Sequence, residues 1–410
     1  MILVEAVNDS HRDSVCTSGG AVYKARTRGR NRVILSSTLY FPNIGGVENS
    51  IYHLGREYRK RGMHPVLLVS TGGDANATAR WFEVKRMHGM PVLRYKFSSI
   101  ALIRFLRAWM ALRILRRRFQ LMAMVARDQH SAVAALLDRQ PCVYLVPGIH
   151  SVQHKPTGRN PLRWANYIVS VMMQRAALRW TPRVAVFSQA MAEAVQREAG
   201  RSTTEQVRPG VDASRFTVLP EEGRAASRRR LGFSADARIA VAVGRFSRQK
   251  RFDLALGALE RLPEKWHLVL VGDGPLRNEL ERHVENAGLA HRVTFTGQVT
   301  DPETYLQVAD VYLLTSDNET FGQVLVEAMA CALPVVAFDP ALPGVDTATN
   351  EVVPEEWLFK ARRKDAEGLS HAWLEAAAAG CDPEGIARWT HERYSWYTVA
   401  SQLVSWGSDT

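Results

Sequence analysis

The sequence contains only four cysteines among its 410 residues, and they lie far apart, at Cys16, Cys142, Cys331 and Cys381. None forms a CxxC pair, which argues against a structural zinc site and a disulfide scaffold and favours a reducing cytoplasm. No stretch reaches the ~20 uninterrupted apolar residues of a membrane-spanning helix, because Arg or Lys interrupts every long apolar run. The first residues, MILVEAVNDSHRD, lack the basic start and apolar stretch of a secretory signal. We therefore expect a cytoplasmic protein that is soluble or peripheral to a membrane.

Acidic residues are fewer than basic ones, 41 against 53, so the formal net charge is +12. This excess suits nucleic acid, acidic lipid or a phosphorylated substrate as partner, and it equally suits a basic surface that only maintains solubility. Hydrophobic residues make up 46% and charged residues 23%, which excludes wholesale disorder and a fibrous repeat. The length exceeds the ~250 residues at which single cores usually stop growing, so we expect two domains.

Short apolar runs alternate with helix-like segments along most of the chain. The run VILSS is followed by the turn FPNIGG, a helical stretch and the run PVLLVS, and a second series extends from IAVAVG to LPVVAF. This alternation predicts two open parallel sheets flanked by helices, with a cleft between them and ligands outside the carboxyl ends of the strands. The expected parts are a loose arm over 1–31, domains over 32–208 and 209–385, and a helix over 386–410 that packs back on the first domain.

Two loops contain the residue types of a phosphate site. Gly45 and Gly46 lie between a strand and a helix, where free N–H groups at the helix start favour an anion; an ordinary tight turn is the alternative. In GRFSRQKRFD, Gly244 ends a strand, and Arg245 and Lys250 follow it. Two cations at such a strand end can neutralise a diphosphate, unless they are merely solvated loop charges. The sequence has no GxGxxG fingerprint and no Walker lysine.

The segment SDNETFGQVLVEAMACALPVVAF contains two glutamates eight residues apart. Glu319 precedes an apparent helix whose start includes Thr320 and Gly322, and Glu327 lies about two turns later, so the two carboxylates are expected on similar sides. Carboxylates that accept hydrogen bonds from vicinal hydroxyls can hold ribose or hexose, and the helix-start amides can receive phosphate. The alternative is an exposed Glu319 and a Glu327 on an ordinary helix face.

Five segments occur together in the order and spacing of one enzyme family: FPNIGGVENSIYHLGREYRKRG, VFSQAMAE with PGVDASRF, VGRFSRQKRFD, LVLVGDGPLRNELE and NETFGQVLVEAMACALPVVA. Over roughly residues 33–340 the chain resembles the retaining nucleotide-sugar glycosyltransferases of glycosyltransferase family 4, also called glycosyl transferases group 1. The resemblance implies the α/β GT-B fold, in which two Rossmann-like, doubly wound parallel sheets face a cleft. It also implies that the first domain takes the acceptor and the second the nucleotide sugar.

The resemblance implies a role for each motif. The catalytic residues that it implies are Arg245, Lys250, Glu319 and His130. The donor-binding residues that it implies are Gly46, Arg245, Lys250, Asp273, Gly274, Gln298, Val299, Glu319, Phe321, Gly322 and Glu327. In this set Arg245 and Lys250 hold the diphosphate, which Gly46 approaches from the other domain. Glu327 binds the donor ribose, and Glu319 contacts hydroxyls of the transferred sugar.

The chain departs from the family pattern near the expected catalytic histidine. Where members have a stretch like VVHAH, this chain reads MAMVARDQHSA, so His130 is close but displaced, and Arg127 and Asp128 lie nearer the usual place. His150 and His154 are second candidates. Pro209 stands where Asn often precedes Gly-Val-Asp, and the stretch after Asp339 lacks the usual Gly-Gly and acidic residue, which leaves the donor sugar open.

The resemblance also implies transfer with retention of anomeric configuration, without an obligatory metal or other cofactor. Charge builds on the diphosphate as the glycosidic bond breaks, and Arg245, Lys250 and helix amides are the groups expected to stabilise it. No DxD-like metal motif stands out in a suitable loop, and no carboxylate stands out as a covalent nucleophile. We therefore favour attack by the acceptor on the face from which the diphosphate leaves.

The stretch IALIRFLRAWMALRILRRRF predicts a helix that is both apolar and basic. Leu102, Phe105, Leu106, Trp109 and Leu112 share one side, and Arg104 and Arg107 lie opposite. Such a helix can lie in an anionic bilayer surface. Core packing with a solvated basic end is the alternative, because the later arginines spread around the helix. The stretch WANYIVSVMMQRAALRW is expected in the domain core.

The leading hypothesis is transfer of a hexose-type sugar from a UDP- or GDP-sugar to a lipid-linked or cell-envelope glycan, in polysaccharide or lipopolysaccharide synthesis at the inner face of the cytoplasmic membrane. A soluble transferase with a small-molecule acceptor is one alternative. A nucleotide-sugar 2-epimerase is another, although the two spaced glutamates with GRFSRQK point away from it. A basic nucleic-acid-binding protein is the non-enzyme alternative, and the sequence lacks a basic-aromatic module for that role.

Overall fold

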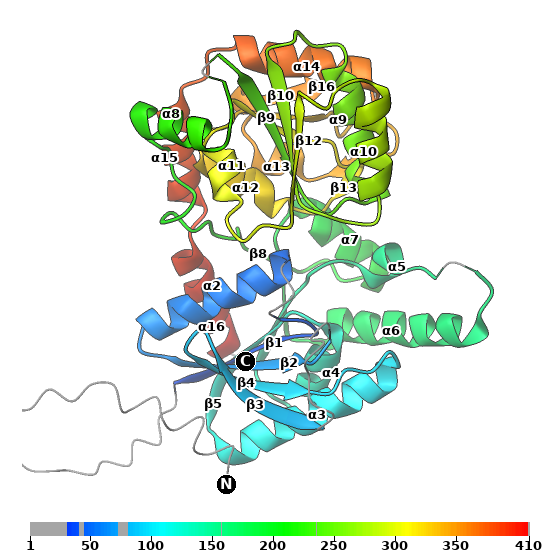
Figure 1. Ribbon diagram of the computed structural model, residues 1–410. Coiled ribbons are helices and arrows are strands. Elements are labelled where there is room, and N and C mark those ends of the chain that lie inside the picture. The colour runs from blue at the N-terminus through cyan, green and yellow to red at the C-terminus, as the bar shows by residue number, and fades with distance from the viewer. Residues whose placement is uncertain (1–30, 41–44, 73–80, 157, 235, 409–410) are drawn as a thin grey trace, which may run out of the picture. The chain divides into compact units, whose positions relative to one another are not determined.

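The structure, a computed structural model, describes residues 31–40, 45–72, 81–156, 158–234 and 236–408, which form two compact units (Figure 1). The first unit comprises the chain up to Phe187, Met191–Val207 and the segment from Trp396 onward. The second comprises Ser188–Ala190 and Arg208–Ser395. The predicted arm over 1–31 lies outside the described residues except for Asn31. None of the helices in the described ranges combines the length and hydropathy needed to cross a bilayer.

The first unit is built on an eight-stranded sheet in the order β3-β4-β2-β1-β5-β6-β7-β8. Its strands are β1 (Arg32–Ser37), β2 (His64–Ser70), β3 (Phe82–Met87), β4 (Met90–Tyr95), β5 (Leu121–Ala126), β6 (Cys142–Leu145), β7 (Arg183–Val186) and β8 (Glu205–Gln206). All pairings are parallel except that of β3 with β4. The predicted parallel sheet is therefore present, with one antiparallel edge strand.

Helices cover both faces of this sheet. They are α2 (Gly46–Lys60), α3 (Ala101–Arg118), α4 (Gln129–Leu137), α5 (His150–Gln153), α6 (Pro161–Trp180), α7 (Gln189–Ala199) and α16 (Trp396–Ser408). On one face, α2 buries Ile51, Leu54 and Tyr58, which recur at helical spacing, beside α16. On the other face, α3, α4, α6 and α7 pack against the strands. Burying each such large side chain is worth about 1.5–3 kcal/mol.

The C-terminal segment forms two helices where the sequence predicted one over 386–410. Helix α15 (Pro383–Arg393) belongs to the second unit, and α16 belongs to the first. The break falls at the short connection between Arg393 and Trp396. The Trp396 ring stacks on His53 of α2 at 5.2 Å, and the Arg61 guanidinium lies 4.0 Å from the centre of the Tyr397 ring. Only α16 therefore packs back on the first unit.

The second unit contains a six-stranded parallel sheet in the order β11-β10-β9-β12-β14-β16. The strands are β9 (Arg238–Val243), β10 (Trp266–Val271), β11 (Val293–Gly297), β12 (Val311–Leu314), β14 (Val335–Phe338) and β16 (Leu358–Ala361), and a separate pair joins β13 (Asn318–Glu319) to β15 (Asp346–Thr347). Numbered along the unit, the main sheet has the doubly wound order 3-2-1-4-5-6. Its switch point lies between β9 and β12.

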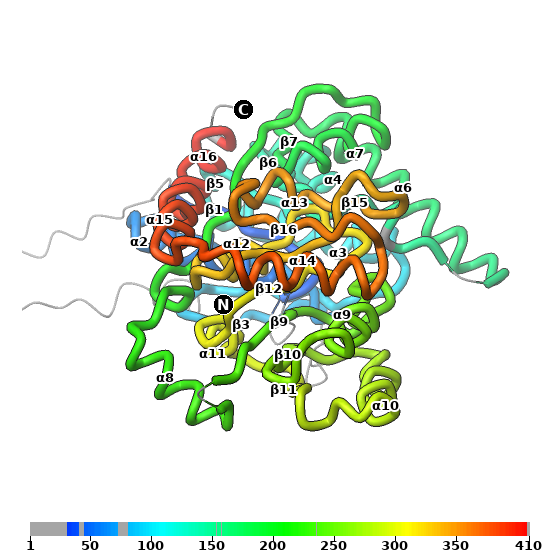
Figure 2. Tube along the Cα trace, turned by 90° about the horizontal axis from the view of Figure 1, so that it is seen from above, coloured from blue at the N-terminus to red at the C-terminus, as the bar shows by residue number. Residues whose placement is uncertain are grey.

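The helices of the second unit are α8 (Glu221–Arg230), α9 (Phe252–Leu259), α10 (Arg277–Asn286), α11 (Glu303–Leu306), α12 (Gln323–Ala330), α13 (Thr349–Val352), α14 (Ala366–Ala378) and α15, with short 3₁₀ turns at Arg248–Lys250 and Glu355–Trp357. Helices α9, α10 and α14 share one core with the strands, and Trp266 meets Trp373 edge to face at 5.3 Å. Figure 2 shows α14 lying across this sheet. Helix α12 contacts β12 and β14.

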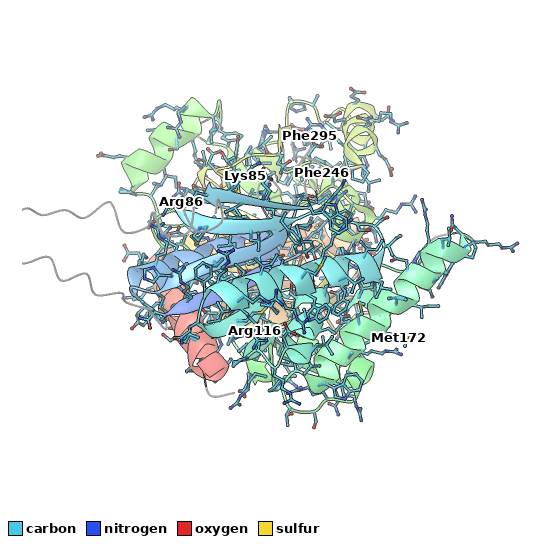
Figure 3. All side chains as sticks on the ribbon, turned by 90° about the horizontal axis from the view of Figure 1, so that it is seen from below. Lys85, Arg86, Arg116, Met172, Phe246 and Phe295 are labelled. Atoms are coloured by element: carbon cyan, nitrogen blue, oxygen red, sulfur yellow. The ribbon has the colours of Figure 1, made fainter. Side chains whose placement is uncertain are left out.

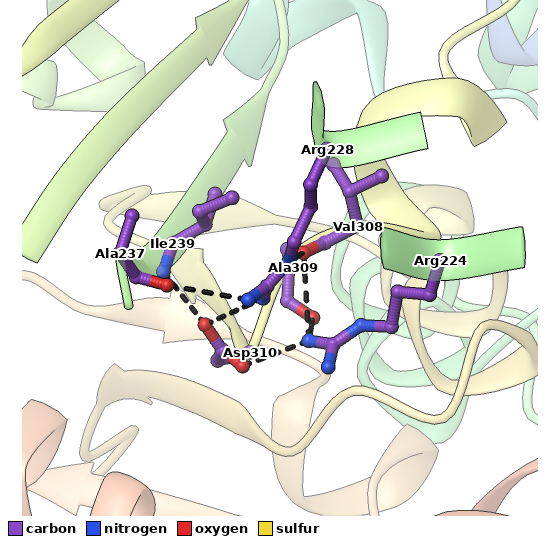
Figure 4. A network of polar contacts seen from close by, with 7 residues as sticks. All are labelled: Arg224, Arg228, Ala237, Ile239, Val308, Ala309 and Asp310. Atoms are coloured by element: carbon purple, nitrogen blue, oxygen red, sulfur yellow. Dashed lines mark hydrogen bonds and ion pairs between the residues drawn. The ribbon is translucent and has the colours of Figure 1, made fainter. Parts of the chain in front are cut away.

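The Pro- and Gly-containing stretch after Val207 is more ordered than a plain linker, because it includes α8. Two arginines of α8 bind Asp310: Arg224 Nη2 donates to Oδ1 at 2.8 Å, and Arg228 Nη2 donates to Oδ2 at 2.9 Å (Figure 4). The same Asp310 Oδ2 accepts a hydrogen bond of 2.7 Å from the Ile239 N–H. This network fixes α8 at the amino ends of β9 and β12 and leaves their carboxyl ends to the site.

Candidate functional site

Most of the predicted donor-binding residues of the second unit follow the carboxyl ends of neighbouring strands. Strand β9 leads into residues 244–251, β10 into 272–276, and β12 into 315–322. Because β9 and β12 flank the switch point, the loops that follow them diverge there and leave room for a ligand. The topology therefore brings GRFSRQK, GDGP and NETFG to one edge of one sheet.

Glycines allow the first two of these loops to lie almost in contact. A Cβ on Gly272, which has φ +135°, would lie 2.0 Å from the Gly244 carbonyl oxygen, and a Cβ on Gly274 would lie 2.5 Å from the Phe246 oxygen. Two hydrogen bonds join these loops. The Gly244 N–H donates to the Val271 oxygen at 2.9 Å, and the Phe246 N–H donates to the Asp273 oxygen at 2.9 Å. The GDGP turn therefore requires glycine for close backbone packing.

Lys250 and Glu319, which lie 69 residues apart in the sequence, bind each other directly. Lys250 Nζ donates a hydrogen bond of 2.5 Å to Glu319 Oε2, and each side chain is about one-fifth exposed. A second bond joins the same loops, because Thr315 Oγ1 donates to the Lys250 carbonyl oxygen at 2.6 Å. Gly322, with φ +78°, lies so close that a Cβ there would be 3.1 Å from Glu319 Cγ. Three predicted site residues therefore form one compact group.

The other cations of GRFSRQKR have different environments. Arg245 is exposed, and none of the described residues hydrogen-bonds to its guanidinium. Arg251 is paired with two carboxylates, since it lies 3.1 Å from Asp253 and 3.7 Å from Asp317. These carboxylates raise the pKa of Arg251. Arg245, like the exposed Arg248, therefore keeps a charge that is available to an anionic ligand.

The two glutamates of the predicted pair lie in different elements. Glu319 belongs to strand β13 and precedes the helix as expected, but α12 begins only at Gln323, so the predicted helix start at Thr320 and Gly322 is wrong. The left-handed conformation of Gly322 separates the strand from the helix. The carboxylates therefore have different neighbours, Lys250 for Glu319 and Arg215 with Glu303 for Glu327.

The pKa of Glu327 lies far above its usual value. Desolvation raises the pKa of its carboxyl group to about 8; the charge of Arg215 acts to lower the pKa, and Glu303 acts to raise it. Arg215 itself is held by Glu303, with Nε–Oε1 at 2.8 Å and Nη2–Oε2 at 2.6 Å. A neutral Glu327 can donate as well as accept a hydrogen bond. Such a group suits a partner with hydroxyls.

Sequence reasoning missed Arg215 and Glu303. Arg215 is part of the PGVDASRF segment that the family resemblance used, but no role was assigned to it. Only the fold places it near Glu327: Gln323 Nε2, at the start of α12, donates to the Gly210 oxygen at 2.9 Å and so fixes this segment to the helix of Glu327.

The remaining donor-binding candidates of the second unit lie around this core. Asp273 and Gln298 are exposed, Val299 is half-buried, and Phe321 is buried edge to face against Tyr394 with centroids 6.2 Å apart. The Asp273 carboxylate accepts a hydrogen bond from the Gly274 N–H at 2.7 Å. Phe321 is thus held by core packing, whereas Asp273 and Gln298 remain accessible.

In the first unit, Gly46 is the first residue of α2, and a Cβ built on it would meet no atom of the described residues within 4 Å. Glu48, in the first turn of the same helix, is buried; desolvation raises its pKa, while its own backbone N–H and the charge of Arg127 act to lower it. The carboxylate thus lies at the helix start, where the positive end of the helix favours an anion. Within the described part of the chain, no residue fills the space beside Gly46.

His130 lies just beyond the carboxyl end of β5, on the first turn of α4. Its ring is buried, Nδ1 lies 3.6 Å from Asp128 Oδ1, and neither ring nitrogen has a hydrogen-bond partner in the part of the chain that the structure describes. Asp128 caps α4 by accepting from the Ser131 N–H at 2.9 Å. Arg127 is also buried, with its guanidinium 4.9 Å from the centre of the Phe187 ring, and desolvation lowers its pKa to about 10.

The second histidine candidates lie on and just beyond α5. The rings of His150 and His154 stack with centroids 4.5 Å apart, and the His150 N–H donates to Gln174 Oε1 at 2.7 Å. Burial lowers the pKa of His150 to about 4, so the ring is neutral at physiological pH. Among the described residues, no three His, Cys, Asp or Glu side chains gather as metal ligands. The expected metal independence stays a prediction.

Two family models match the chain. Residues 44–215 match the model described as Glycosyltransferase Family 4, and residues 223–375 match the model described as Glycosyl transferases group 1. The two matches do not overlap, and together they cover most of the described chain. They include the loop of Gly46 and His130 in the first match and the group around Lys250, Glu319 and Glu327 in the second.

Similar proteins include the alpha-monoglucosyldiacylglycerol synthase of Streptococcus pneumoniae, 24% identical over 86% of this chain and 79% of that protein. The lipopolysaccharide core biosynthesis glycosyltransferase LpsE of Rhizobium meliloti is 35% identical over 28% of this chain, which spans about a third (33%) of that protein. Among solved structures, HepE of Anabaena in complex with UDP and glucose has a TM-score of 0.71 at 21% identity, covering 92% of this chain and 100% of that one. This last likeness shows the fold.

Proposed function

Because the chain belongs to the glycosyl transferases group 1 and glycosyltransferase family 4 and has the GT-B fold, we propose that it is a retaining transferase that moves a hexose-type sugar from a UDP- or GDP-sugar to a lipid-linked or cell-envelope glycan. The observation that carries this proposal is the group formed by Lys250, Glu319 and Gly322 at the switch point of the second unit. A cation and a carboxylate in contact there offer one partner to phosphate and one to sugar hydroxyls.

The proposed reaction exchanges one bond at the anomeric carbon. The bond from C1 to the phosphate oxygen breaks, and its electron pair stays on the diphosphate. The acceptor hydroxyl oxygen bonds to C1 on the face that the diphosphate leaves, and its proton passes to the leaving phosphate oxygen. Arg245 and Lys250 stabilise the charge that develops on the diphosphate, and such fixed charges are commonly worth 10²–10³-fold in rate.

Two further groups have proposed roles in holding the donor. Glu327 binds the ribose hydroxyls, which its raised pKa supports because a protonated carboxyl can both donate and accept. The resemblance implies a catalytic role for His130 of the first unit. Because its ring is buried beside Asp128, we propose that it acts as a positioning residue. With two cations serving the diphosphate, we propose that no metal ion or other cofactor is required.

The names of two similar proteins support the acceptor class. One acts as an alpha-monoglucosyldiacylglycerol synthase and another in lipopolysaccharide core biosynthesis. Both names refer to products that are lipids or are anchored by them. We propose by this analogy that the acceptor is presented at a membrane and that the enzyme works as a peripheral protein at its cytoplasmic face.

The test is a panel of UDP- and GDP-hexoses incubated with the purified chain and a lipid-linked glycan acceptor, with release of free UDP or GDP as the readout. The proposal expects one donor to be consumed, EDTA to leave the rate unchanged, and the product to keep the donor's anomeric configuration by NMR. Consumption of no donor overturns the proposal, and formation of an epimerised UDP-sugar without an acceptor restores the 2-epimerase alternative.

A further inference from the structure

The N-terminal half of helix α6 does not pack into the core that the sequence assigned to it. No residue of 161–169 is buried, whereas the second half buries Gln174, Ala177 and Leu178. In Figure 2 the end of α6 that begins at Pro161 extends away from the rest of the first unit. Two turns of an apolar helix therefore remain in solvent.

The exposed part of α6 has an apolar stripe along one side. Leu162, Ala165, Val169 and Met172 recur at i, i+3, i+7 and i+10, the spacing of one helix face. Leu162 is 80% exposed and Met172 is 63% exposed. Single exposed apolar residues are ordinary, but a periodic row of them marks an interaction surface.

Helix α3 contributes a second apolar row next to the first. Leu102, Leu106 and Met110 recur at i, i+4 and i+8 and are all exposed, while the opposite side of α3 packs in the core. Asn166 of α6 caps α3, because its Oδ1 accepts a hydrogen bond of 2.7 Å from the Ala101 N–H. Figure 3 shows α3, with Arg116 labelled, beside α6, with Met172 labelled. We call these seven apolar residues of the two helices the α3–α6 surface.

Most of the charged residues around the α3–α6 surface are basic. Residues 154–180 contain no Asp or Glu, and their cations are Lys155, Arg159, Arg163, Arg175 and Arg179. Arg175 is paired with Glu198 at 2.8 Å, but no ion pair joins any of the other four to a described residue. Helix α3 also lacks acidic residues, and its last turn contains Arg116, which lies 3.6 Å from Asp138, and the exposed Arg117 and Arg118.

We propose that the α3–α6 surface docks on an anionic lipid bilayer. Apolar side chains flanked by Lys and Arg are the combination by which a helix binds the headgroup boundary, since the apolar row enters the lipid and the cations meet the phosphates. A second copy of the chain is a poor occupant, because it would bring the same positive charges face to face. A projecting convex helix also offers no groove for a soluble apolar ligand.

The inference deepens the proposal of a lipid-linked acceptor, but it can be tested apart from it. Vesicle binding needs neither donor nor acceptor, so its failure would leave the transferase reaction standing. Conversely, a chain that consumed no nucleotide sugar could still bind vesicles through α3 and α6.

The experiment is flotation of the full chain with vesicles of phosphatidylcholine alone or with 30 mol% phosphatidylglycerol. Binding is expected only to the anionic vesicles and is expected to weaken as salt rises, because screening reduces the attraction. The variant Leu162→Ser with Met172→Ser should lose about tenfold in partition coefficient, since it removes two of the apolar anchors. The variant Arg159→Gln with Arg163→Gln should lose binding to a similar degree.

Matched controls lie on the second unit. Leu374→Ser removes an exposed apolar residue of α14, and Arg229→Gln with Arg230→Gln removes two exposed charges of α8. Both controls should bind as wild type does, and all variants should keep the wild-type melting temperature. No flotation of the wild type, or equal flotation of the Leu162 and Met172 variant, overturns the proposal. A wild-type dimer that this variant converts to a monomer, or capture of an acidic protein without vesicle binding, would also overturn it.

Discussion

The ammonium group of Lys250 donates a 2.5 Å hydrogen bond to Glu319 and so joins the loop after β9 to strand β13. In the free protein this cation already has an anionic partner. A diphosphate that binds Lys250 must therefore compete with the Glu319 carboxylate or share the ammonium with it.

We expect Glu319→Gln to separate donor binding from transfer. Without the Glu319 carboxylate, no anion of this pair competes with the diphosphate for Lys250, so the affinity for UDP should rise about threefold. Turnover should fall, because Glu319 is proposed to hold the transferred sugar. Calorimetry with UDP and a steady-state assay measure the two effects, with Glu279→Gln, an exposed glutamate of α10, as the control. Weaker UDP binding in Glu319→Gln would contradict the competition.

The raised pKa of Glu327 predicts a pH-dependent stability. The pKa in the folded protein is about 8 and the ordinary value is 4.5, so between these values the folded state holds a proton that the unfolded state has released. The free energy of unfolding should therefore decrease as pH rises through this window. The variant Glu327→Gln has no titratable carboxyl group at this position, so it lacks this pH-dependent contribution to stability.

Urea unfolding of the wild type and Glu327→Gln at pH 5.5 and pH 8.5 measures this effect. From pH 5.5 to pH 8.5, the free energy of unfolding of the variant minus that of wild type should rise by more than about 1.4 kcal/mol, which is equivalent to one pKa unit. An unchanged difference would show that Glu327 is ionised throughout and that its proposed donor role at neutral pH is wrong.

Gly274→Ala should damage the junction between β9 and β10. The new Cβ would lie 2.5–2.9 Å from backbone atoms of Phe246, which cannot rotate away, and such overpacking costs about 1–3 kcal/mol. UDP affinity should fall with it, because the loop of Arg245 must shift. Gly223→Ala in α8, with its nearest contact at 3.9 Å, is the matched control and should be neutral or stabilising. Equal melting temperatures for the two variants would count against the close packing.

Asp310→Ala should destabilise the second unit without touching the donor loops. The substitution leaves two arginine partners and the Ile239 N–H without their acceptor, a loss of about 3 kcal/mol. Arg229→Ala on the same helix is exposed and should change stability by less than about 0.5 kcal/mol. Chemical unfolding compares them, and near-wild-type stability of Asp310→Ala would refute the role of the network.

The sheet architecture could be predicted from the sequence, because apolar runs and turn residues are local signals. The runs VILSS, PVLLVS and IAVAVG coincide with β1, β2 and β9, and the glycine after β9 follows from the same pattern. The break between α15 and α16 could not be predicted, because the residues on both sides favour helix. The assignment of the two helices to different units depends on tertiary packing.

The site was predictable in its residues but not in its pairings. Motif spacing singled out Lys250 and Glu319, yet only the parallel order of β9 and β12 explains why residues so distant in sequence make contact. The predicted helix start at Thr320 and Gly322 was wrong, because Gly322 adopts a left-handed conformation and α12 begins only at Gln323. The exposure of α6 could not be predicted either, because the sequence pattern of an apolar helix is the same whether the helix is buried or exposed.

The central claim is that fixed cations of the second unit stabilise the leaving diphosphate, and turnover of the active donor by Arg245→Ala and Lys250→Ala tests it most directly. With the affinity for the intact nucleotide-sugar donor measured on the same samples, each variant should lose at least about 100-fold in kcat while its Kd for this donor changes far less, because the charge develops in the transition state. Arg248→Ala, an exposed neighbour, should retain turnover. Wild-type kcat in both Arg245→Ala and Lys250→Ala would contradict the account.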